Sequence, residues 1–443
     1  MASSTKKRAF AALLTNIARL LLSVVLMVSG FVKAVDPMGF TYKLQEYLAA
    51  FGLTGIDEGW ILAGALFLSA AEFIMGVLLL MGVYTGVATF LTFLFFLFFT
   101  PFTLILAVWN PVHDCGCFGD ALQLSNEATF AKNAVLLVCA TMVWFRRRLF
   151  IRRISPVNRW MVSLFAFCYI ALVEGVSLSH LPVMDFRPFA VGSNLRSAVV
   201  DIPSEIKVLY RFEKDGQVQE FDDETYPDST WNYLGSSSYV IKQGQPALIA
   251  DFAFMDMATG DDYAPAILED SGYVCIVVIN RIETADESRV DKINDLYDYC
   301  VEQGVPFFAA TSSEEEDVEL WRKRTGAEYS MLWADEVMLK TIVRSNPGVL
   351  LIKDGRVAGK WNVNDLPSVE QFHESPTAMP DKAPSIYRYI RGWKQWVLLL
   401  VVPLLLISLV DVATMRRRKS PSADDVADDN TTTDKTEDKQ QLS

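Results

Sequence analysis

The sequence has few cysteines, few charged residues and no excess of positive charge. Six cysteines in 443 residues are too sparse for a small secreted disulfide scaffold, whose chain is short and rich in cysteine. The net charge of −13 argues against nucleic acid as a partner, because binding to phosphates needs an excess of Lys and Arg. Charged residues make up 21% of the chain and hydrophobic residues 51%. Very apolar segments must therefore alternate with separate acidic ones.

Six segments are apolar enough to cross a bilayer, which takes roughly 20 apolar residues. They are residues 10–32, 60–81, 83–109, 129–145, 160–178 and 393–412. The first follows a basic cluster, as a signal peptide does, but its length and the lack of a small-residue cleavage site favour a retained helix. The sequence therefore predicts an α-helical integral membrane bundle in contact with the lipid bilayer.

Basic clusters at residues 6–8, 146–159 and 416–419 predict how the chain crosses the membrane. Six spans place all three clusters on one side, which the positive-inside rule assigns to the cytoplasm. We expect a multi-pass protein of a bacterial inner (cytoplasmic) membrane, with both termini cytoplasmic and residues 180–392 extracytoplasmic. Residues 185–392 hold 20 basic and 36 acidic residues, a net charge of −16, against 20 and 17, or +3, for the remainder. The acidity therefore belongs to one outward segment.

The loop between the third and fourth spans contains two cysteines one residue apart, Cys115 and Cys117. A disulfide between them would close a very small ring, and Gly116 would permit the tight backbone that this ring requires. Strained and exposed disulfides are typically labile and catalytic, whereas a structural disulfide usually joins distant segments. The pair is therefore a candidate redox site.

The neighbours of this pair leave other interpretations open. Asp114 and Asp120 would raise the pKa of a nearby thiol, and His113 would offset that effect when protonated. A metal site is disfavoured, because no second Cys/His pair completes four ligands. A purely structural turn remains an alternative.

Two ionisable residues, Lys33 and Glu72, lie in the first two spans. An intramembrane carboxylate is costly and often functional. Three alternatives are open for Glu72: it is protonated, it forms an ion pair with Lys33, or it forms a hydrogen bond with a neighbouring helix. Its role is a polar tie between helices or part of proton or quinone chemistry.

Several motifs together resemble the DoxX/MauE family. They are the run from Ala18 to Phe40 followed by Leu44 and Tyr47, Glu72 with Gly76, and the Asp-Cys-Gly-Cys-Phe-Gly loop at residues 114–119. The resemblance covers residues 9–148, or four helices. It implies disulfide formation or maturation of a periplasmic enzyme subunit, a role that transfers only to Cys115 and Cys117; nothing indicates methylamine metabolism itself.

From about residue 247 the chain alternates between strand and helix patterns. The expected strands are residues 247–254, 272–279, 305–310 and 328–333, the helices are 285–303, 313–325 and 336–343, and a hairpin with an Asp354–Gly355 turn covers 346–361. We expect Ser312 or Ser313 to cap the second helix.

This order resembles the thioredoxin-like fold over residues 245–365. The resemblance implies a cis peptide bond at Pro347. It departs from that family at residues 280–286, which contain no Cys-x-x-Cys, so we do not expect dithiol chemistry in this domain. Such a domain can still bind a partner along the backbone beside Pro347. Cys275 and Cys300 are buried free thiols or a disulfide.

These patterns predict a four-helix DoxX-like core plus two further transmembrane helices, with an extracytoplasmic α/β thioredoxin-like domain. The divisions are residues 1–150 (four-helix domain), 151–184 (fifth helix), 185–244 (connector, with a hairpin near 208–221), 245–370 (thioredoxin-like domain without Cys-x-x-Cys), 371–392 (linker), 393–412 (sixth helix) and 413–443 (disordered cytoplasmic tail).

The expected function is extracytoplasmic thiol–disulfide chemistry, or maturation of an envelope protein, through the Cys115/Cys117 loop. The chain would then be a thiol–disulfide oxidoreductase acting on an extracytoplasmic protein client. A membrane quinone near Glu72 would accept the electrons, by analogy with disulfide generators, and no metal is expected. The alternative is a non-catalytic membrane scaffold or assembly factor whose acidic outer domain binds an envelope partner.

Overall fold

The structure is a computed structural model of the chain that describes residues 2–112, 119–122, 124–151, 154–374 and 393–419. The chain divides into two compact units. One comprises Met1–Asp185 with Pro384–Ser443, and the other comprises Phe186–Ala383. We call them the membrane unit and the α/β unit.

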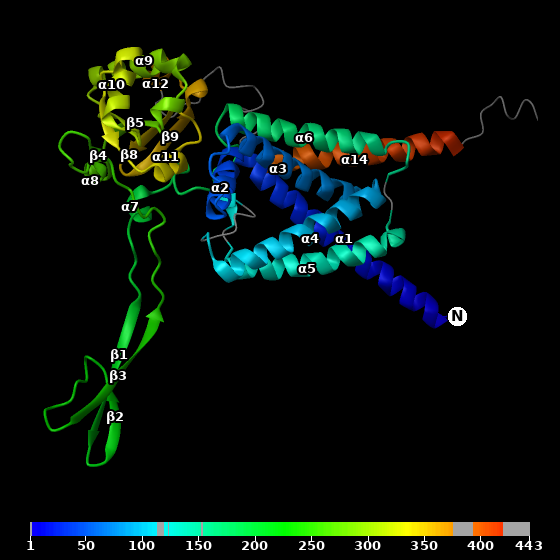
Figure 1. Cartoon of the computed structure of the whole chain (residues 1–443), viewed down its shortest axis with the longest axis horizontal. Helices are drawn as coiled ribbons and strands as arrows, with labels where there is room; N and C mark the ends of the chain where they lie inside the picture. Colours follow the sequence, from blue (N-terminus) through cyan, green and yellow to red (C-terminus); the bar gives the residue numbers. More distant parts are fainter. Residues whose placement is uncertain (1, 113–118, 123, 152–153, 375–392, 420–443) are drawn as a thin grey trace, which may run out of the picture. The chain divides into compact units, whose positions relative to one another are not determined.

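The membrane unit consists of α-helices, most of them long (Figure 1). Its helices are α1 (Ala2–Val35), α2 (Pro37–Ala50), α3 (Glu58–Met81), α4 (Thr85–Trp109), α5 (Asn126–Phe145), α6 (Arg159–Ser179) and α14 (Trp393–Lys419), with short 3-10 turns at Gly119–Ala121 (η1) and Arg147–Leu149 (η2). All of these helices except α2 are long and apolar enough to span a membrane. The six predicted spans are therefore confirmed, and α2 is an additional helix.

Helices α1 and α3 pack against each other through glycine. A Cβ atom at Gly30 would lie 2.5 Å from the backbone nitrogen of Phe73, and one at Gly76 would lie 2.8 Å from that of Met27. Small residues allow such close approach of helices in membranes. The close approach brings Lys33, which follows Gly30, and Glu72, which precedes Gly76, within bonding distance of each other.

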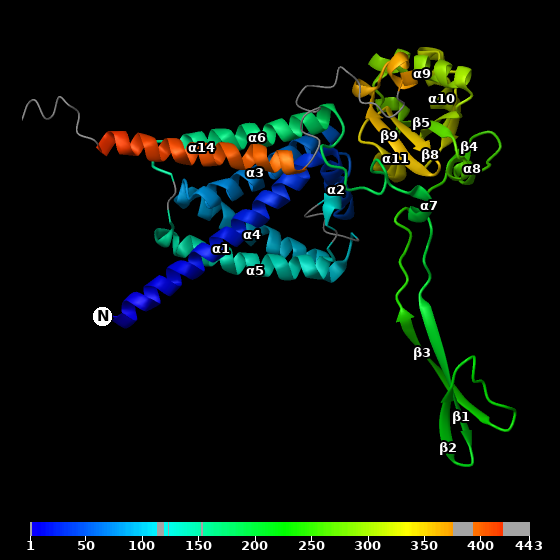
Figure 2. The same ribbon diagram turned by 180° about the vertical axis from the view of Figure 1, so that it is seen from behind.

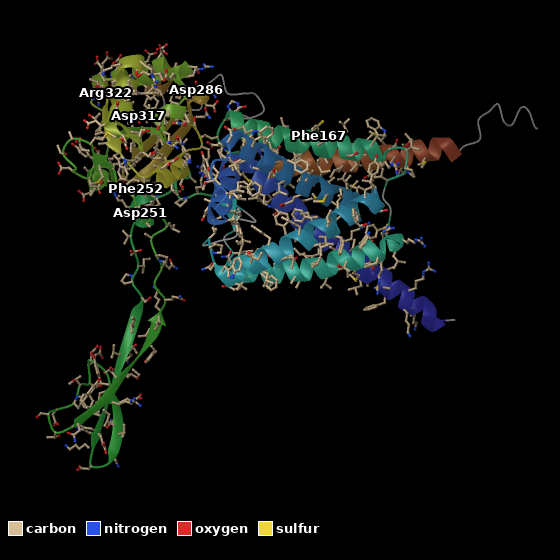
Figure 3. All side chains as sticks on the ribbon, viewed as in Figure 1. Phe167, Asp251, Phe252, Asp286, Asp317 and Arg322 are labelled. Carbon is tan, nitrogen blue, oxygen red and sulfur yellow. The ribbon has the colours of Figure 1, made fainter. Side chains whose placement is uncertain are left out.

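The last helix, α14, lies beside α6 in both views of the bundle (Figures 1 and 2). The carboxylate of Asp411 accepts hydrogen bonds from the backbone N–H of Ser155 at 3.0 Å, from its hydroxyl, and from Nδ2 of Asn158 at 2.8 Å. On α6, the Tyr169 hydroxyl donates to the backbone oxygen of Trp396 at 3.0 Å. On the other side of α6, Phe167 is exposed and points away from the bundle (Figure 3).

The α/β unit begins with a short helix, α7 (Leu195–Ala198), and a three-stranded antiparallel sheet in the order β2-β1-β3. Its strands are β1 (Glu205–Lys214), β2 (Gln217–Phe221) and β3 (Asn232–Lys242). The expected hairpin corresponds to β1 and β2. Strand β3 is not predicted, because its Gly-Ser-Ser-Ser centre lacks the apolar alternation of a half-buried strand.

A second, six-stranded sheet has the order β4-β7-β6-β5-β8-β9. Its strands are β4 (Met255–Asp256), β5 (Tyr273–Ile279), β6 (Phe307–Thr311), β7 (Ser330–Trp333), β8 (Gly348–Lys353) and β9 (Arg356–Asn362), and its helices are α8 (Ala264–Glu269), α9 (Val290–Gln303), α10 (Glu315–Thr325), α11 (Glu336–Ile342) and α12 (Val369–Glu374). Strands β5, β6 and β7 are parallel, and the others are antiparallel to their neighbours.

Helices cover both faces of this sheet (Figure 1). Residues of α9, α10 and α12 join one hydrophobic core with the sheet, and α11 contacts β5 and β6 on the other face. Strand β5 is buried from Val274 to Ile279, as expected for a strand with helices on both faces. The hairpin turn has positive φ at Asp354 and Gly355, and the peptide bond before Pro347 is cis.

Two local predictions in this unit are wrong. Residues 247–254 contain a bend and turn at 248–251 and no strand; the Ile249 amide bonds to the backbone oxygen of Ala198 and the Ala253 amide to that of Asp251. Neither predicted serine caps α10, which begins after Glu314. The Ser313 hydroxyl instead accepts the amide hydrogen of Ile282 at 3.0 Å.

Candidate functional site

Lys33 of α1 and Glu72 of α3 form a buried ion pair. The Lys33 Nζ lies 2.7 Å from each carboxylate oxygen of Glu72 and donates to Ser29 Oγ at 2.9 Å. The two side chains are 6% and 3% exposed. The ring centroid of Phe40 lies 5.3 Å from Nζ and adds a cation–π contact. The sequence leaves open whether Glu72 is protonated, pairs with Lys33 or bonds a neighbouring helix. In the structure it pairs with Lys33.

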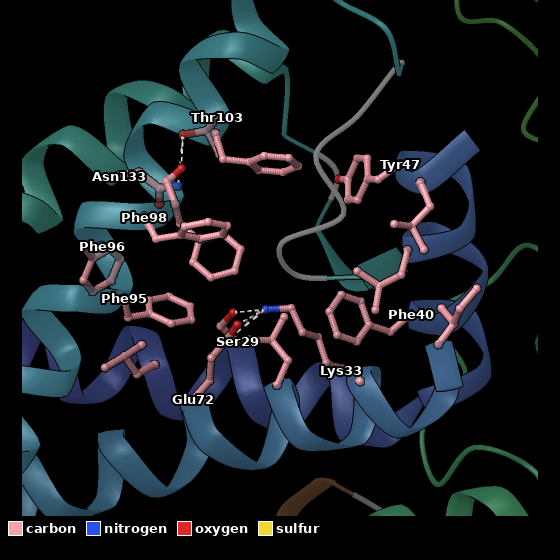
Figure 4. A pocket seen from close by; sticks show the side chains of 18 of the residues that line it. Ser29, Lys33, Phe40, Tyr47, Glu72, Phe95, Phe96, Phe98, Thr103 and Asn133 are labelled. Carbon is pink, nitrogen blue, oxygen red and sulfur yellow. Dashed lines mark hydrogen bonds and ion pairs between the residues drawn. The ribbon is translucent and has the colours of Figure 1, made fainter. Parts of the chain in front are cut away.

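This ion pair lies on the wall of a cavity of about 600 Å³ (Figure 4). Helices α1 to α5 all contribute to the wall, and most of its surface is apolar and aromatic. The aromatic side chains include five phenylalanines of α4 (Phe95, Phe96, Phe98, Phe99 and Phe102). A volume of this size falls within the roughly 300–1,000 Å³ of small-molecule sites.

A second polar group lies on another wall of the cavity, formed by α4 and α5 (Figure 4). Asn133 Nδ2 donates to Thr103 Oγ1 at 3.3 Å, and the backbone oxygen of Asn133 accepts from Thr100 Oγ1 at 3.3 Å. Both Thr103 and Asn133 are buried. The cavity is therefore apolar with a polar group on each of two walls.

The two described ends of the cysteine loop are attached next to this cavity. Val112 is buried against Tyr47, which lines the cavity. Asn126 Nδ2 donates to the backbone oxygen of Val112 at 2.7 Å. At the other end, a Cβ atom at Gly119 would lie 3.6 Å from Cγ1 of Val32, the residue before Lys33. The loop thus leaves and rejoins the described structure beside the cavity.

The predicted residues of the loop itself lie outside the described residues. They are His113, Asp114, Cys115, Gly116 and Cys117. Asp120 belongs to η1, and its side chain is likewise not described.

One buried carboxylate of the bundle is an addition to the predicted site. Glu174 of α6 accepts a hydrogen bond from Ser69 Oγ at 2.6 Å. Ser69 lies one helical turn before Glu72 on α3, so this helix presents polar contacts both to α1 and to α6. The position of Ser69 one turn before Glu72 is the sequence signal that relates Glu174 to the site.

In the α/β unit, polar contacts connect the segment after β5 to the start of β8. Asn346, which precedes Pro347, donates through Nδ2 to the backbone oxygen of Arg281 at 2.7 Å. Its backbone oxygen accepts the amide hydrogen of Asp286 at 2.8 Å. Hydrogen bonding to backbone, followed by the Ser313 hydroxyl, lowers the pKa of Glu283. These contacts hold residues 281–286 beside the start of β8.

Cys275 and Cys300 are buried free thiols. A hydrogen bond with Cys300, together with burial, raises the pKa of Cys275 well above its usual value, and a neutral thiol is a poor nucleophile. Within the described part of the chain, no three His, Cys, Asp or Glu side chains are grouped to hold a metal ion.

Residues 11–146 match the family model of the methylamine utilisation protein MauE, and residues 205–243 match a domain of unknown function, DUF8463. No curated protein matches the chain. A crystal structure of an uncharacterized conserved protein from Geobacillus kaustophilus is similar over 32% of this chain and 75% of its own, at 12% identity and a TM-score of 0.22, which is too low to bear on fold or function. The MauE match spans every residue that lines the cavity. The chain is therefore a multi-pass membrane protein with a MauE-type region at residues 11–146.

Proposed function

We propose that the chain carries out thiol–disulfide exchange on the extracytoplasmic side of a bacterial inner membrane, with Cys115 and Cys117 as the reacting pair. The observation that carries the proposal is the attachment of Val112 and Gly119 next to the cavity. Three peptide units from Val112 reach at most about 11 Å, and two from Gly119 about 7 Å. This limits how far either cysteine lies from an anchored end of its loop.

A client dithiol attacks the Cys115–Cys117 disulfide, and a client disulfide and a Cys115/Cys117 dithiol result. The dithiol then gives two electrons and two protons to a quinone, which becomes a quinol while the disulfide re-forms. The cavity beside Lys33 and Glu72 supports this second step, because it is apolar, has polar groups on two walls and is large enough for a quinone ring.

The α/β unit is proposed to be a thioredoxin-like domain that binds the client. Three parallel strands followed by the antiparallel β8–β9 hairpin support this assignment. The backbone beside Pro347 would pair with an extended client segment. Because residues 280–286 have no cysteine, the domain would position the client while Cys115 and Cys117 react.

The test is trapping of the client in living cells. Single replacements, Cys115→Ser and Cys117→Ser, should each remove turnover, and one of them should accumulate a mixed disulfide with a client. Cys168→Ser is the matched control, because this exposed cysteine lies on α6 and does not line the cavity. If the double replacement leaves client disulfides and cell growth unchanged, the redox proposal is wrong.

The three-stranded sheet favours a second candidate function, that of a scaffold which binds an envelope protein. Apolar side chains on this sheet are exposed, among them Val218, Tyr239 and Ile241. Deletion of residues 205–243 distinguishes the two functions. A scaffold would lose its partner on this deletion and would tolerate replacement of both loop cysteines. A redox protein would tolerate the deletion and would lose its function when both loop cysteines are replaced.

A further inference from the structure

We propose that the cavity of the membrane unit binds an uncharged, single-chain amphiphile that enters sideways from the bilayer between α3 and α4. The inference concerns the same cavity as the proposed electron acceptor, and it rests on the proposed function only where the amphiphile is taken to be the quinone. Three features of the cavity support the inference: its opening, the depth of that opening and the charge of its wall.

The wall of the cavity is open where α3 faces α4. Trp60 of α3 and Phe98 of α4 both line the cavity and are nevertheless 77% and 66% exposed at the surface of the unit. Gly64, which also lines the cavity and lies one helical turn after Trp60 on α3, has no atom within 4 Å of the position of its missing Cβ. Helix α3 packs mainly on α1, and α4 mainly on α5. The two helix pairs thus leave an opening that side chains do not fill.

The opening begins near the first turn of α3, where Trp60 is two residues from the first residue of the helix, and at Phe98 it lies at the depth of the hydrocarbon. Phe98 is 13 residues from the first residue of α4 and 11 from the last, or about 20 and 17 Å along the helix. The middle of a spanning helix is surrounded by acyl chains. A molecule entering here therefore comes from the bilayer and presents an apolar chain to the aromatic wall.

The charges on the cavity wall select an uncharged head. Lys33 and Glu72 neutralise each other, and the three donors of Lys33 are directed at Ser29 and Glu72. A second cation on the wall, Lys132, has an interaction partner of its own. A charged head would lose its hydration without gaining a counter-charge, which is strongly unfavourable.

A hydroxyl or carbonyl head does find partners in the cavity. The oxygens of Glu72 have lone pairs beyond those facing Lys33, and Asn133 and Thr103 offer further polar atoms on another wall. The volume of about 600 Å³ suits one head and one chain. The shared chemistry is that of a quinone or of a neutral single-chain lipid.

The experiment is photolabelling of the full-length chain in lipid nanodiscs. The probe is a decyl-benzoquinone with a diazirine in its alkyl chain, and the protein carries Cys115→Ser and Cys117→Ser, so that the loop thiols do not react with the probe. Decanol, decanoate, decyltrimethylammonium and decyl-benzoquinone without the diazirine are the unlabelled competitors. We expect decanol to compete at least about tenfold better than either charged compound, a difference of about 1.4 kcal/mol.

Gly64→Trp should block the opening and lower labelling at least about tenfold. Gly175→Trp is the matched control, since this exposed glycine of α6 also has open space at its Cβ and does not line the cavity. Phe98→Ala widens the opening and should speed labelling. This second variant keeps the test decisive if the Gly64→Trp protein does not fold. The competitors also identify the source: a better result for unlabelled decyl-benzoquinone than for decanol supports a quinone, and an equal result supports a neutral lipid.

Equal labelling of the Gly64→Trp and Gly175→Trp proteins would overturn the inference. So would competition by decanoate or decyltrimethylammonium as strong as that by decanol. Because the labelled protein lacks both loop cysteines, its result is independent of the redox function. Intact labelling together with client disulfides that are unchanged by the double cysteine replacement would refute the proposed function and leave the binding site.

Discussion

Replacement of Lys33 by Met should destabilise the membrane unit far more than replacement of both members of the ion pair. Lys33→Met leaves the carboxylate of Glu72 buried, at 3% exposure, without its counter-charge. Lys33→Met combined with Glu72→Leu removes both charges and keeps a similar side-chain volume. The single variant is therefore expected to be less stable than the double variant.

The magnitude follows from the geometry of the pair. Unit charges 2.7 Å apart attract by about 6 kcal/mol at an effective dielectric constant of 20. Removal of both ions from water costs several kcal/mol each, so the net contribution of the pair is small. Loss of one partner should lower the free energy of unfolding by about 3–5 kcal/mol, whereas the apolar double replacement should be neutral or stabilising by about 1–4 kcal/mol.

The assay is reversible unfolding of the full-length chain in mixed micelles, followed by circular dichroism. Lys43→Met is the control, because Lys43 forms a pair of similar length, 2.8 Å, with the more exposed Glu46. A surface pair of this kind contributes less than about 1 kcal/mol. If Lys33→Met and Lys43→Met lose the same free energy of unfolding, or if the double variant is as unstable as Lys33→Met, then the argument from burial is wrong.

Gly30→Ala should lower the free energy of unfolding by about 1–3 kcal/mol in the same assay, because the new Cβ would meet the α3 backbone at 2.5 Å. Cys275 should resist alkylation in the folded chain at neutral pH and react after denaturation, since its hydrogen bond with Cys300 and its burial raise its pKa. Hydrogen bonds from Thr225 and a nearby lysine lower the pKa of Asp222. Its contribution to stability is therefore present above the unfolded carboxyl pKa and lost as the pH falls through the lower native value, which Asp222→Asn and acid unfolding can measure.

Each of these predictions has a clear contrary outcome. Gly86→Ala, whose Cβ would meet no atom within 4 Å, should leave stability unchanged, and an equal loss in both glycine variants would contradict the close approach of α1 and α3. Mass spectrometry that finds Cys275 alkylated in the folded state would contradict its burial. Identical acid unfolding of the wild type and Asp222→Asn would contradict the native hydrogen bonds of this carboxylate.

Hydropathy alone predicts the six spans, because the length of an apolar segment is a local property of the sequence. Helix α2 is missed, although Asp36 and Pro37 give it a recognisable start: the Asp36 carboxylate accepts the amide hydrogen of Gly39, and proline occupies the first turn. The sequence places this segment in a loop because it is too short to span a membrane. A short helix between two spans thus has to be sought by its capping signals.

The cavity is not predictable from the sequence. Its wall combines side chains from five helices, and the pattern of one helix does not say which neighbour each face meets. The pairing of Lys33 with Glu72 is one of three alternatives at the sequence level, and it depends on the close approach at Gly30 and Gly76. Tertiary packing likewise overrides the apolar pattern of residues 247–254, which form no strand.

The hydrogen bonds of Asp411 have a consequence for biosynthesis. Asp411 and Ser155 are 256 residues apart in the chain, and ribosomes add about 5–20 residues per second. The loop before α6, which contains Ser155, is therefore synthesised roughly 10 to 50 s before Asp411, the acceptor of its hydrogen bonds. During this interval the α6 surface that later packs against Trp396 and Leu404 has no α14 to cover it. A chain truncated anywhere in the α/β unit keeps that surface uncovered, which gives membrane proteases and chaperones a physical difference between finished and unfinished molecules.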